Sequence, residues 1–161
     1  MPVSGIGPKV PEKSQRTEPR SVVLLVDDQA IVAEALRLML ANQPDIELHV
    51  CSSGAAALSH ARKLRPTVIL QDLVMPEVDG FTLVRFFRAD PDLAATPIIV
   101  LSSKEDPRDK SRAFEVGASD YLVKIPDKIE LMARVRAHSR DDGAARGGTW
   151  REWRREQRRR G

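Results

Sequence analysis

The stretch Val22-Val23-Leu24-Leu25-Val26-Asp27-Asp28 is an apolar run that ends in two carboxylates, and three later runs follow the same pattern. Each ends in a polar residue: Val68-Ile69-Leu70-Gln71 in Asp72, Ile98-Ile99-Val100-Leu101 in Ser102, and Tyr121-Leu122-Val123 in Lys124. Short runs rich in Val and Ile and bounded by turn residues are typical of buried parallel strands. In open α/β sheets, ligands bind at the carboxyl ends of the strands. The sequence therefore predicts that three carboxylates, a hydroxyl and an ammonium group meet at one edge of one sheet.

Helical patterns separate these strands. We predict helices at 29–42, 54–64, 81–89, 107–116 and 127–139, and a further strand at 46–51 whose alternating pattern indicates a place nearer the sheet edge. Gly117 fits the end of one helix, and Asp127 with Glu130 has the spacing of a capping box at the start of another. Five strand–helix units with buried strands favour an α/β fold, with a parallel sheet covered by helices on both faces.

The net charge of +3 comes from the two ends of the chain. Residues 1–20 carry four basic and two acidic groups, and residues 141–161 carry seven arginines against four acids. Residues 21–140 carry 15 basic and 17 acidic groups, so this part gives no electrostatic reason to expect nucleic-acid binding. We expect residues 1–20 to be disordered, residues 21–140 to form one domain, and residues 141–161 to form a disordered Arg- and Gly-rich tail.

Composition also indicates the cellular compartment of the chain. No apolar stretch is long enough to span a bilayer, and residues 1–20 lack the apolar segment of a secretory signal. The single cysteine, Cys51, excludes an intrachain disulfide and favours a reducing, cytoplasmic setting. We interpret Cys51 as a buried thiol on the second strand. His49, His60 and His138 lack the spacing of metal ligands, and we assign none of them to a site.

The predicted sheet edge has the composition of a metal and phosphoryl site. Three carboxylates repel one another unless a cation lies between them, so Asp27, Asp28 and Asp72 favour Mg²⁺, which prefers oxygen ligands. A carboxylate beside Mg²⁺ can accept a phosphoryl group as an aspartyl phosphate. Such a transfer depends on positioning and on neutralised charge, for which Lys124 and Ser102 offer an ammonium and a hydroxyl group. The alternative, that each is a solvated strand end or turn residue, is weaker for the set than for any one member.

The chain resembles the receiver domain of two-component response regulators across about residues 21–140. The resemblance rests on ordered motifs: Leu24-Leu25-Val26-Asp27-Asp28, Asp72-Leu73-Val74-Met75-Pro76 with Asp79-Gly80, Ser102-Ser103, and Gly117-Ala118-Ser119-Asp120-Tyr121-Leu122-Val123-Lys124. It implies a flavodoxin-like (βα)5 three-layer sandwich whose parallel sheet has the strand order 2-1-3-4-5. It also implies that Asp72 is the phosphoacceptor and that Asp28, Asp72 and the Val74 backbone carbonyl bind Mg²⁺, with Asp27 assisting. Lys124 and Ser102 would contact the phosphoryl group. Tyr121 would be an aromatic switch that moves inward as Ser102 shifts toward the phosphate.

The function that this resemblance implies is Mg²⁺-dependent phosphorylation of Asp72 by a sensor histidine kinase. The phosphoryl group then changes the face formed by the fourth helix, fifth strand and fifth helix, for binding to a downstream effector or for homodimerisation. For Tyr121, the alternative to a switch is a buried aromatic residue that packs on a helix. We expect no enzymatic activity beyond self-phosphorylation and autodephosphorylation.

One departure from the family pattern points to a subgroup. Many receivers have proline directly after the lysine, whereas Ile125 stands between Lys124 and Pro126 here. This form, together with the segment Ile69–Pro76, is similar to the receiver of Wsp-type response regulators, whose output is a diguanylate cyclase that makes cyclic-di-GMP. The chain contains no Gly-Gly-(Asp/Glu)-Glu-Phe motif, so cyclase activity does not carry over. We expect a stand-alone receiver or a truncated or frameshifted fragment.

Two other functions stay open at this point. A phosphatase-type hydrolase also forms an aspartyl phosphate, but such enzymes typically use Asp-x-Asp at the first strand, whereas Asp27 and Asp28 are adjacent here. The Arg-rich tail, with Trp150 and Trp153, is compatible with a tether to nucleic acid or to an anionic membrane. A disordered end is the interpretation of the tail that we favour.

Overall fold

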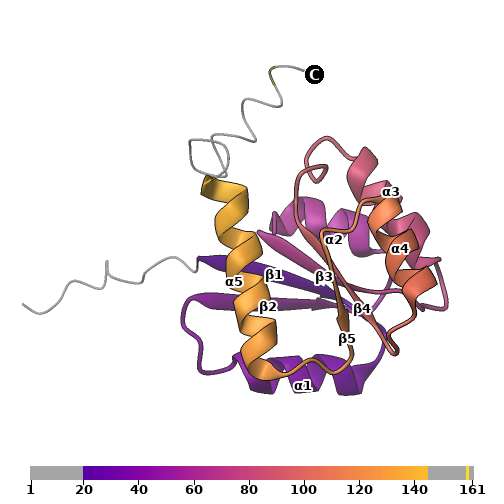
Figure 1. Ribbon diagram of the computed structural model, residues 1–161. Coiled ribbons are helices and arrows are strands. Elements are labelled where there is room, and N and C mark those ends of the chain that lie inside the picture. The colour runs from indigo at the N-terminus through magenta and orange to yellow at the C-terminus, as the bar shows by residue number, and fades with distance from the viewer. Residues whose placement is uncertain (1–19, 145–158, 160–161) are drawn as a thin grey trace, which may run out of the picture.

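Five parallel strands alternate with five helices in the computed structural model, which describes residues 20–144 and residue 159. The strands form one sheet of order β2-β1-β3-β4-β5. The bounds are β1 Ser21–Val26, α1 Ala30–Leu40, β2 Ile46–Cys51, α2 Ala57–Leu64, β3 Val68–Asp72, α3 Gly80–Ala89, β4 Ile98–Ser102, α4 Pro107–Val116, β5 Asp120–Val123 and α5 Lys128–Ala144. Helices α1 and α5 cover one face of the sheet and α2, α3 and α4 the other (Figure 1). The predicted flavodoxin-like α/β sandwich is confirmed.

Two hydrophobic clusters occupy the two faces of the sheet, because successive side chains of a strand point to opposite sides. Leu24 and Ile69 belong to the cluster under α2, α3 and α4, whereas Val23 and Leu70 belong to the cluster under α1 and α5. Every residue of β3 and β4 is buried, as their unbroken apolar runs predicted. The edge strand β2 exposes Glu47, in agreement with its alternating pattern.

Local hydrogen bonds explain where the last two helices end and begin. Gly117 closes α4 with a φ of 117°, a left-handed conformation that glycine adopts readily. The Asp127 carboxylate accepts hydrogen bonds from the backbone N–H groups of Ile129 (3.0 Å) and Glu130 (3.3 Å) at the start of α5. This is one arm of the predicted capping box. The Glu130 side chain lies instead 3.7 Å from Arg134 on the next turn.

Two helix bounds differ from the sequence prediction by three residues or more, and the other helix bounds by at most two. Helix α2 begins at Ala57 rather than Gly54, because the preceding turn packs against the loop after β3, where a Cβ on Gly54 would lie 2.4 Å from Val78 Cγ1. Helix α5 continues past Ser139 to Ala144, since its last turn has no large apolar residue from which periodicity could predict it. The expectations for residues 1–20 and for the rest of the tail lie almost wholly outside the described residues.

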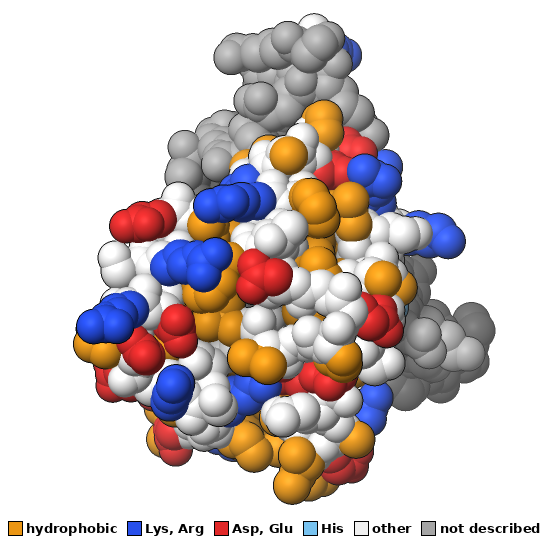
Figure 2. Space-filling model, turned by 90° about the vertical axis from the view of Figure 1, so that its right-hand side faces the viewer, with side chains coloured by type: hydrophobic (Ala, Val, Ile, Leu, Met, Phe, Trp, Pro, Cys, Tyr) orange, Lys and Arg blue, Asp and Glu red, His pale blue; other side chains and the backbone are white. Residues whose placement is uncertain are grey.

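The surface carries charges of both signs. Figure 2 shows a face on which acidic and basic side chains are interspersed, with hydrophobic side chains between them. This agrees with the mildly acidic composition of residues 21–140. In the described part of the chain, no helix combines the length and the apolar character needed to cross a membrane.

Candidate functional site

The ends of three strands bring Asp27, Asp72 and Lys124 into direct contact. Asp27 follows β1, Asp72 is the last residue of β3, and Lys124 follows β5. Lys124 Nζ lies 2.8 Å from Asp72 Oδ1 and 3.0 Å from Asp27 Oδ2. The side chains are 8%, 3% and 0% exposed for Lys124, Asp72 and Asp27, so water screens these charges little. The structure therefore brings together residues far apart in the chain at the sheet edge where the apolar runs predicted them.

Asp28 completes a group of three carboxylates. One oxygen from each of Asp27, Asp28 and Asp72 lies within 4.8 Å of the other two. Asp28 is exposed, unlike the other two. In the described part of the chain, a single ammonium group, that of Lys124, is paired with the two buried carboxylates. Asp72 Oδ2 is buried and has no hydrogen-bond partner among the described residues. This donor set, with its excess of negative charge, fits a hard divalent cation.

The protonation equilibria reflect the same excess. Burial raises the pKa of Asp72, and the charge of Asp27 adds to this effect, although the hydrogen bond from Lys124 opposes it. Burial lowers the pKa of Lys124, but its hydrogen bonds with Asp72 and Asp27 outweigh burial and hold the pKa above its usual value. The folded chain therefore disfavours the charge on Asp72 unless a further cation binds.

The segments that follow β1 and β3 complete the site. The Gln29 N–H donates to Asp27 Oδ1 (2.9 Å), and Gln29 Oε1 accepts from Lys124 Nζ (3.1 Å). The Val74 N–H donates to Asp72 Oδ1 (3.2 Å). A hollow of about 160 Å³ is lined by Gln29, Asp72, Leu73, Val74, Ser102, Ser103 and Lys124. Sequence reasoning missed Gln29, for which the only signal was its place directly after the two carboxylates; the role of the Val74 carbonyl stays a prediction.

Ser102 and Tyr121 meet at the backbone carbonyl of Lys104. Ser102 Oγ donates to this oxygen at 2.9 Å, and the Tyr121 hydroxyl donates to it at 3.0 Å. Tyr121 is 7% exposed, so its side chain is buried beside this loop. The two side chains share one acceptor in the β4–α4 loop, and the switch role of Tyr121 stays a prediction.

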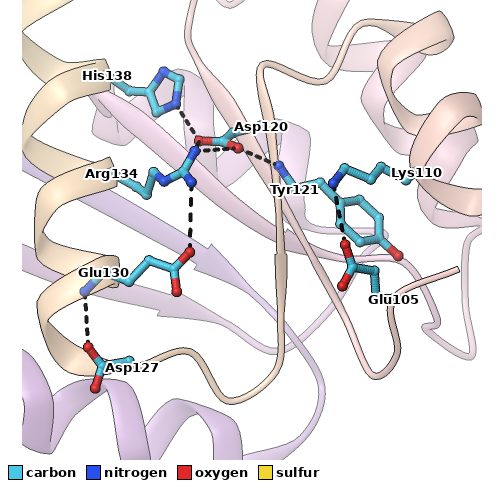
Figure 3. Close-up of polar contacts among 8 residues, drawn as sticks. All are labelled: Glu105, Lys110, Asp120, Tyr121, Asp127, Glu130, Arg134 and His138. Atoms are coloured by element: carbon cyan, nitrogen blue, oxygen red, sulfur yellow. Dashed lines mark hydrogen bonds and ion pairs between the residues drawn. The ribbon is translucent and has the colours of Figure 1, made fainter. Parts of the chain in front are cut away.

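A second charged cluster lies between β5 and α5 (Figure 3). Arg134 Nη1 donates to both carboxylate oxygens of Asp120, at 2.9 and 3.1 Å, and His138 Nε2 lies 2.9 Å from Asp120 Oδ2. Burial raises the pKa of Asp120, but the hydrogen bonds from His138, the Tyr121 N–H and Arg134 outweigh it and hold the pKa below its usual value. His138 is thus a partner of Asp120, away from the three carboxylates, and Cys51 is buried on β2 as predicted.

Comparison with known proteins connects this geometry to a family. The model of the response regulator receiver domain matches residues 23–136. The DNA-binding response regulator MtrA of Mycolicibacterium paratuberculosis is 39% identical over 121 residues, which are 75% of this chain and 52% of MtrA. Response regulator PleD of Caulobacter vibrioides is 34% identical over 118 residues, or 73% of this chain and 26% of PleD. The chain thus spans about half the length, or less, of these curated relatives.

Solved structures agree. The receiver domain of Francisella response regulator 1452 superposes with a TM-score of 0.68 at 28% identity, and the match covers 74% of this chain and 97% of that one. The family model, the fold and the strand-end carboxylates all coincide on the same part of the chain. The chain belongs to the response regulator receiver domain family.

Proposed function

We propose that this chain is the phospho-accepting receiver of a two-component phosphorelay, with Asp72 as the phosphoacceptor. The observation that carries the proposal is how the two oxygens of the Asp72 carboxylate, at the end of the central strand β3, are hydrogen-bonded. Lys124 and the Val74 N–H contact its Oδ1, while Oδ2 is free of hydrogen bonds among the described residues. One oxygen is therefore held in place, and no hydrogen bond from the described residues occupies the other oxygen of this potential nucleophile.

In the proposed step, an Asp72 carboxylate oxygen forms a bond to the phosphorus of a phosphohistidine on a sensor histidine kinase. The phosphorus–nitrogen bond breaks, and the imidazole keeps the electron pair and takes up a proton. Lys124 offsets charge on the transferred group, and the Ser102 hydroxyl donates a hydrogen bond to it. Asp28, Asp72 and the Val74 carbonyl, assisted by Asp27, are the groups that would hold Mg²⁺, which when bound supplies two further positive charges.

The phosphoryl group adds up to about two negative charges at neutral pH. We expect it to favour a conformation in which Ser102 Oγ leaves the Lys104 carbonyl and turns to the phosphoryl group. Because Tyr121 donates to the same carbonyl, this exchange changes the β4–α4 loop beside the face formed by α4, β5 and α5. A downstream effector or a second copy of the chain would recognise that change.

The proposal includes a cytoplasmic location and no enzymatic output beyond self-phosphorylation and autodephosphorylation. Two output pathways are compatible with it. The Lys124-Ile125-Pro126 order supports closeness to Wsp-type regulators and thus cyclic-di-GMP signalling, whereas the similarity to MtrA supports an output through DNA binding. Pull-down experiments with the phosphorylated chain distinguish them, because a diguanylate cyclase partner would support the first pathway and a DNA-binding partner the second.

The test of phosphoacceptance is labelling by acetyl phosphate, followed by intact-protein mass spectrometry. We expect labelling of the wild type only with Mg²⁺ present, and none in Asp72→Asn. Asp120→Asn is the matched control, since it makes the same chemical change in the cluster between β5 and α5 and should leave labelling intact. A folded wild type that stays unlabelled with Mg²⁺ would contradict the proposal, and sustained turnover of phosphate monoesters would indicate a hydrolase.

A further inference from the structure

A buried amide lies directly before the proposed phosphoacceptor. Gln71 is 0% exposed in the central strand β3, and its register partners in the neighbouring strands are Val26 and Val100. These valines belong to the hydrophobic cluster under α2, α3 and α4. A primary amide in such surroundings costs free energy unless all of its hydrogen-bonding groups are satisfied, so its presence calls for a physical reason.

The amide nitrogen of Gln71 ties the end of β3 to the beginning of α3. Its Nε2 donates to the Gly80 carbonyl at 2.7 Å and to the Asp72 carbonyl at 3.3 Å. The Gly80 N–H in turn donates to the Leu73 carbonyl at 3.1 Å. Gly80 also packs so closely that an added Cβ would lie 2.5 Å from Leu73 Cα. These contacts close the base of the loop 73–79, which begins immediately after Asp72.

The same loop reaches the proposed phosphoryl site. Val74 donates its N–H to Asp72 Oδ1 and pairs with Asp79 across the loop in an isolated antiparallel bridge. Leu73 and Val74 line the hollow beside Asp72 and Lys124. The position of the loop base therefore sets the position of the backbone groups that face the carboxylate. Gln71 reaches that base from inside the core, through Gly80, without lining the hollow itself.

Stability alone does not account for this residue. Gln71 Oε1 is buried and has no hydrogen-bond partner among the described residues, so half of the amide is unsatisfied. A buried polar group in this condition destabilises the fold relative to an apolar side chain of similar size. Locally unfavourable features of this kind persist at functional sites, where they hold a geometry that the site needs.

We propose that Gln71 is a positioning residue, which holds the loop after Asp72 in the geometry that binds a divalent cation and accepts the phosphoryl group. The inference rests on the proposed function and adds a residue to it. Outer-shell partners of metal ligands typically change metal affinity by about 10- to 100-fold when they are removed. Gln71 contacts the loop backbone and not a metal ligand side chain, so we expect a change in metal affinity at the lower end of that range.

The experiment compares Gln71→Leu with wild type in the full 161-residue chain. We expect the dissociation constant for Mg²⁺ alone, measured by calorimetry, to rise about tenfold, while the urea midpoint of unfolding stays equal or rises. Thr96→Val is the matched control. Thr96 is 0% exposed, its Oγ1 also lacks a partner among the described residues, and it lies before β4 rather than at the strand ends. This control should leave Mg²⁺ affinity unchanged.

A second readout needs no cation. Hydrogen exchange of the Gly80 amide, followed by NMR in the metal-free chain, should be at least severalfold faster in Gln71→Leu than in wild type, and unchanged in Thr96→Val. Unaltered Mg²⁺ affinity with unaltered Gly80 exchange would overturn the proposal, as would a loss of affinity that merely follows a loss of stability. Gln71→Met replaces Gln71→Leu if the latter fails to fold. If wild type itself binds no Mg²⁺, the proposed function fails, and the exchange data alone decide whether Gln71 positions the loop.

Discussion

The strand-end group and the cluster between β5 and α5 are both built from carboxylates and cations, but their charges are balanced differently. At the strand ends, the described residues provide one cation, Lys124, in contact with both Asp27 and Asp72. In the second cluster, Arg134 and His138 both contact Asp120. Burial accordingly prevails at Asp72, whose pKa is raised, and is outweighed at Asp120, whose pKa is lowered. The feature that fits a cation site is therefore the excess of negative charge at the strand ends, because both clusters contain charged residues.

The largest test of this contrast removes the cation from each group. Lys124→Met should lower the free energy of unfolding by about 3 kcal/mol without divalent cations, because it leaves two buried carboxylates uncompensated. Arg134→Met should cost less than about 1 kcal/mol, since the Arg134 side chain is 46% exposed and His138 still contacts Asp120. Urea unfolding at neutral pH measures both values. Equal losses in the two variants would show that the difference in burial has no energetic consequence.

Adding Mg²⁺ should act on one group only. At a free concentration about 100 times the dissociation constant, a ligand that binds only the folded state stabilises it by about 2.7 kcal/mol. We expect this gain in wild type and in Asp120→Asn, and a much smaller gain in Asp28→Asn. Asp28 is exposed, so its substitution leaves the core intact. Thermal unfolding with and without Mg²⁺ measures the gain, and an equal shift in all three proteins would contradict a site at the strand ends.

A smaller effect, with opposite signs at the two aspartates, is expected from pH. Because folding lowers the pKa of Asp120, its contribution to stability is present above the ordinary value of 3.8 and is lost as the pH falls through the lower folded value. Asp120→Asn should therefore cost about 1.5 kcal/mol at neutral pH, and this cost should shrink in acid. Urea midpoints of wild type and Asp120→Asn, measured across the acid range, show whether this difference in stability shrinks.

Asp72 should behave in the reverse way. Folding raises the pKa of Asp72, so without divalent cations the folded state gains stability as the pH falls through that raised value toward the ordinary value of 3.8. Asp72→Asn should then be more stable than wild type at neutral pH, with the difference vanishing in acid. If Asp72→Asn and Asp120→Asn both lost stability at neutral pH, the proposed difference in charge balance between the strand-end group and the cluster between β5 and α5 would be wrong.

The sequence predicted the strand-end group because each polar residue directly follows an apolar run, and parallel strands present their carboxyl ends at the same edge. It did not predict the Asp120–His138 contact, which depends on how α5 packs across β5. Nor did it predict the carbonyl of Lys104 as the shared acceptor of Ser102 and Tyr121, because loop backbone direction has no periodic signature. In the sequence, Gln71 is one residue of an otherwise apolar run, and only the folded loop shows what its amide contacts.

The smallest effect is expected at the Lys110–Glu105 pair beside the second cluster (Figure 3). The two charged groups are 3.5 Å apart, and their side chains are 43% and 68% exposed. Water and salt compete for such groups, so Lys110→Ala should change the free energy of unfolding by less than about 0.5 kcal/mol.

If Lys110→Ala lost more than about 1 kcal/mol of unfolding free energy in urea, exposure would not weaken ion pairs on this face. Burial would then not explain why the strand-end group and the cluster between β5 and α5 differ. Lys110 and Glu105 line a hollow over β5 together with Tyr121. Because the substitution should leave the fold unchanged, any effect of Lys110→Ala on partner binding or dimerisation would report contact at this hollow directly. The same inference from Lys124→Met would be confounded by its large loss of stability.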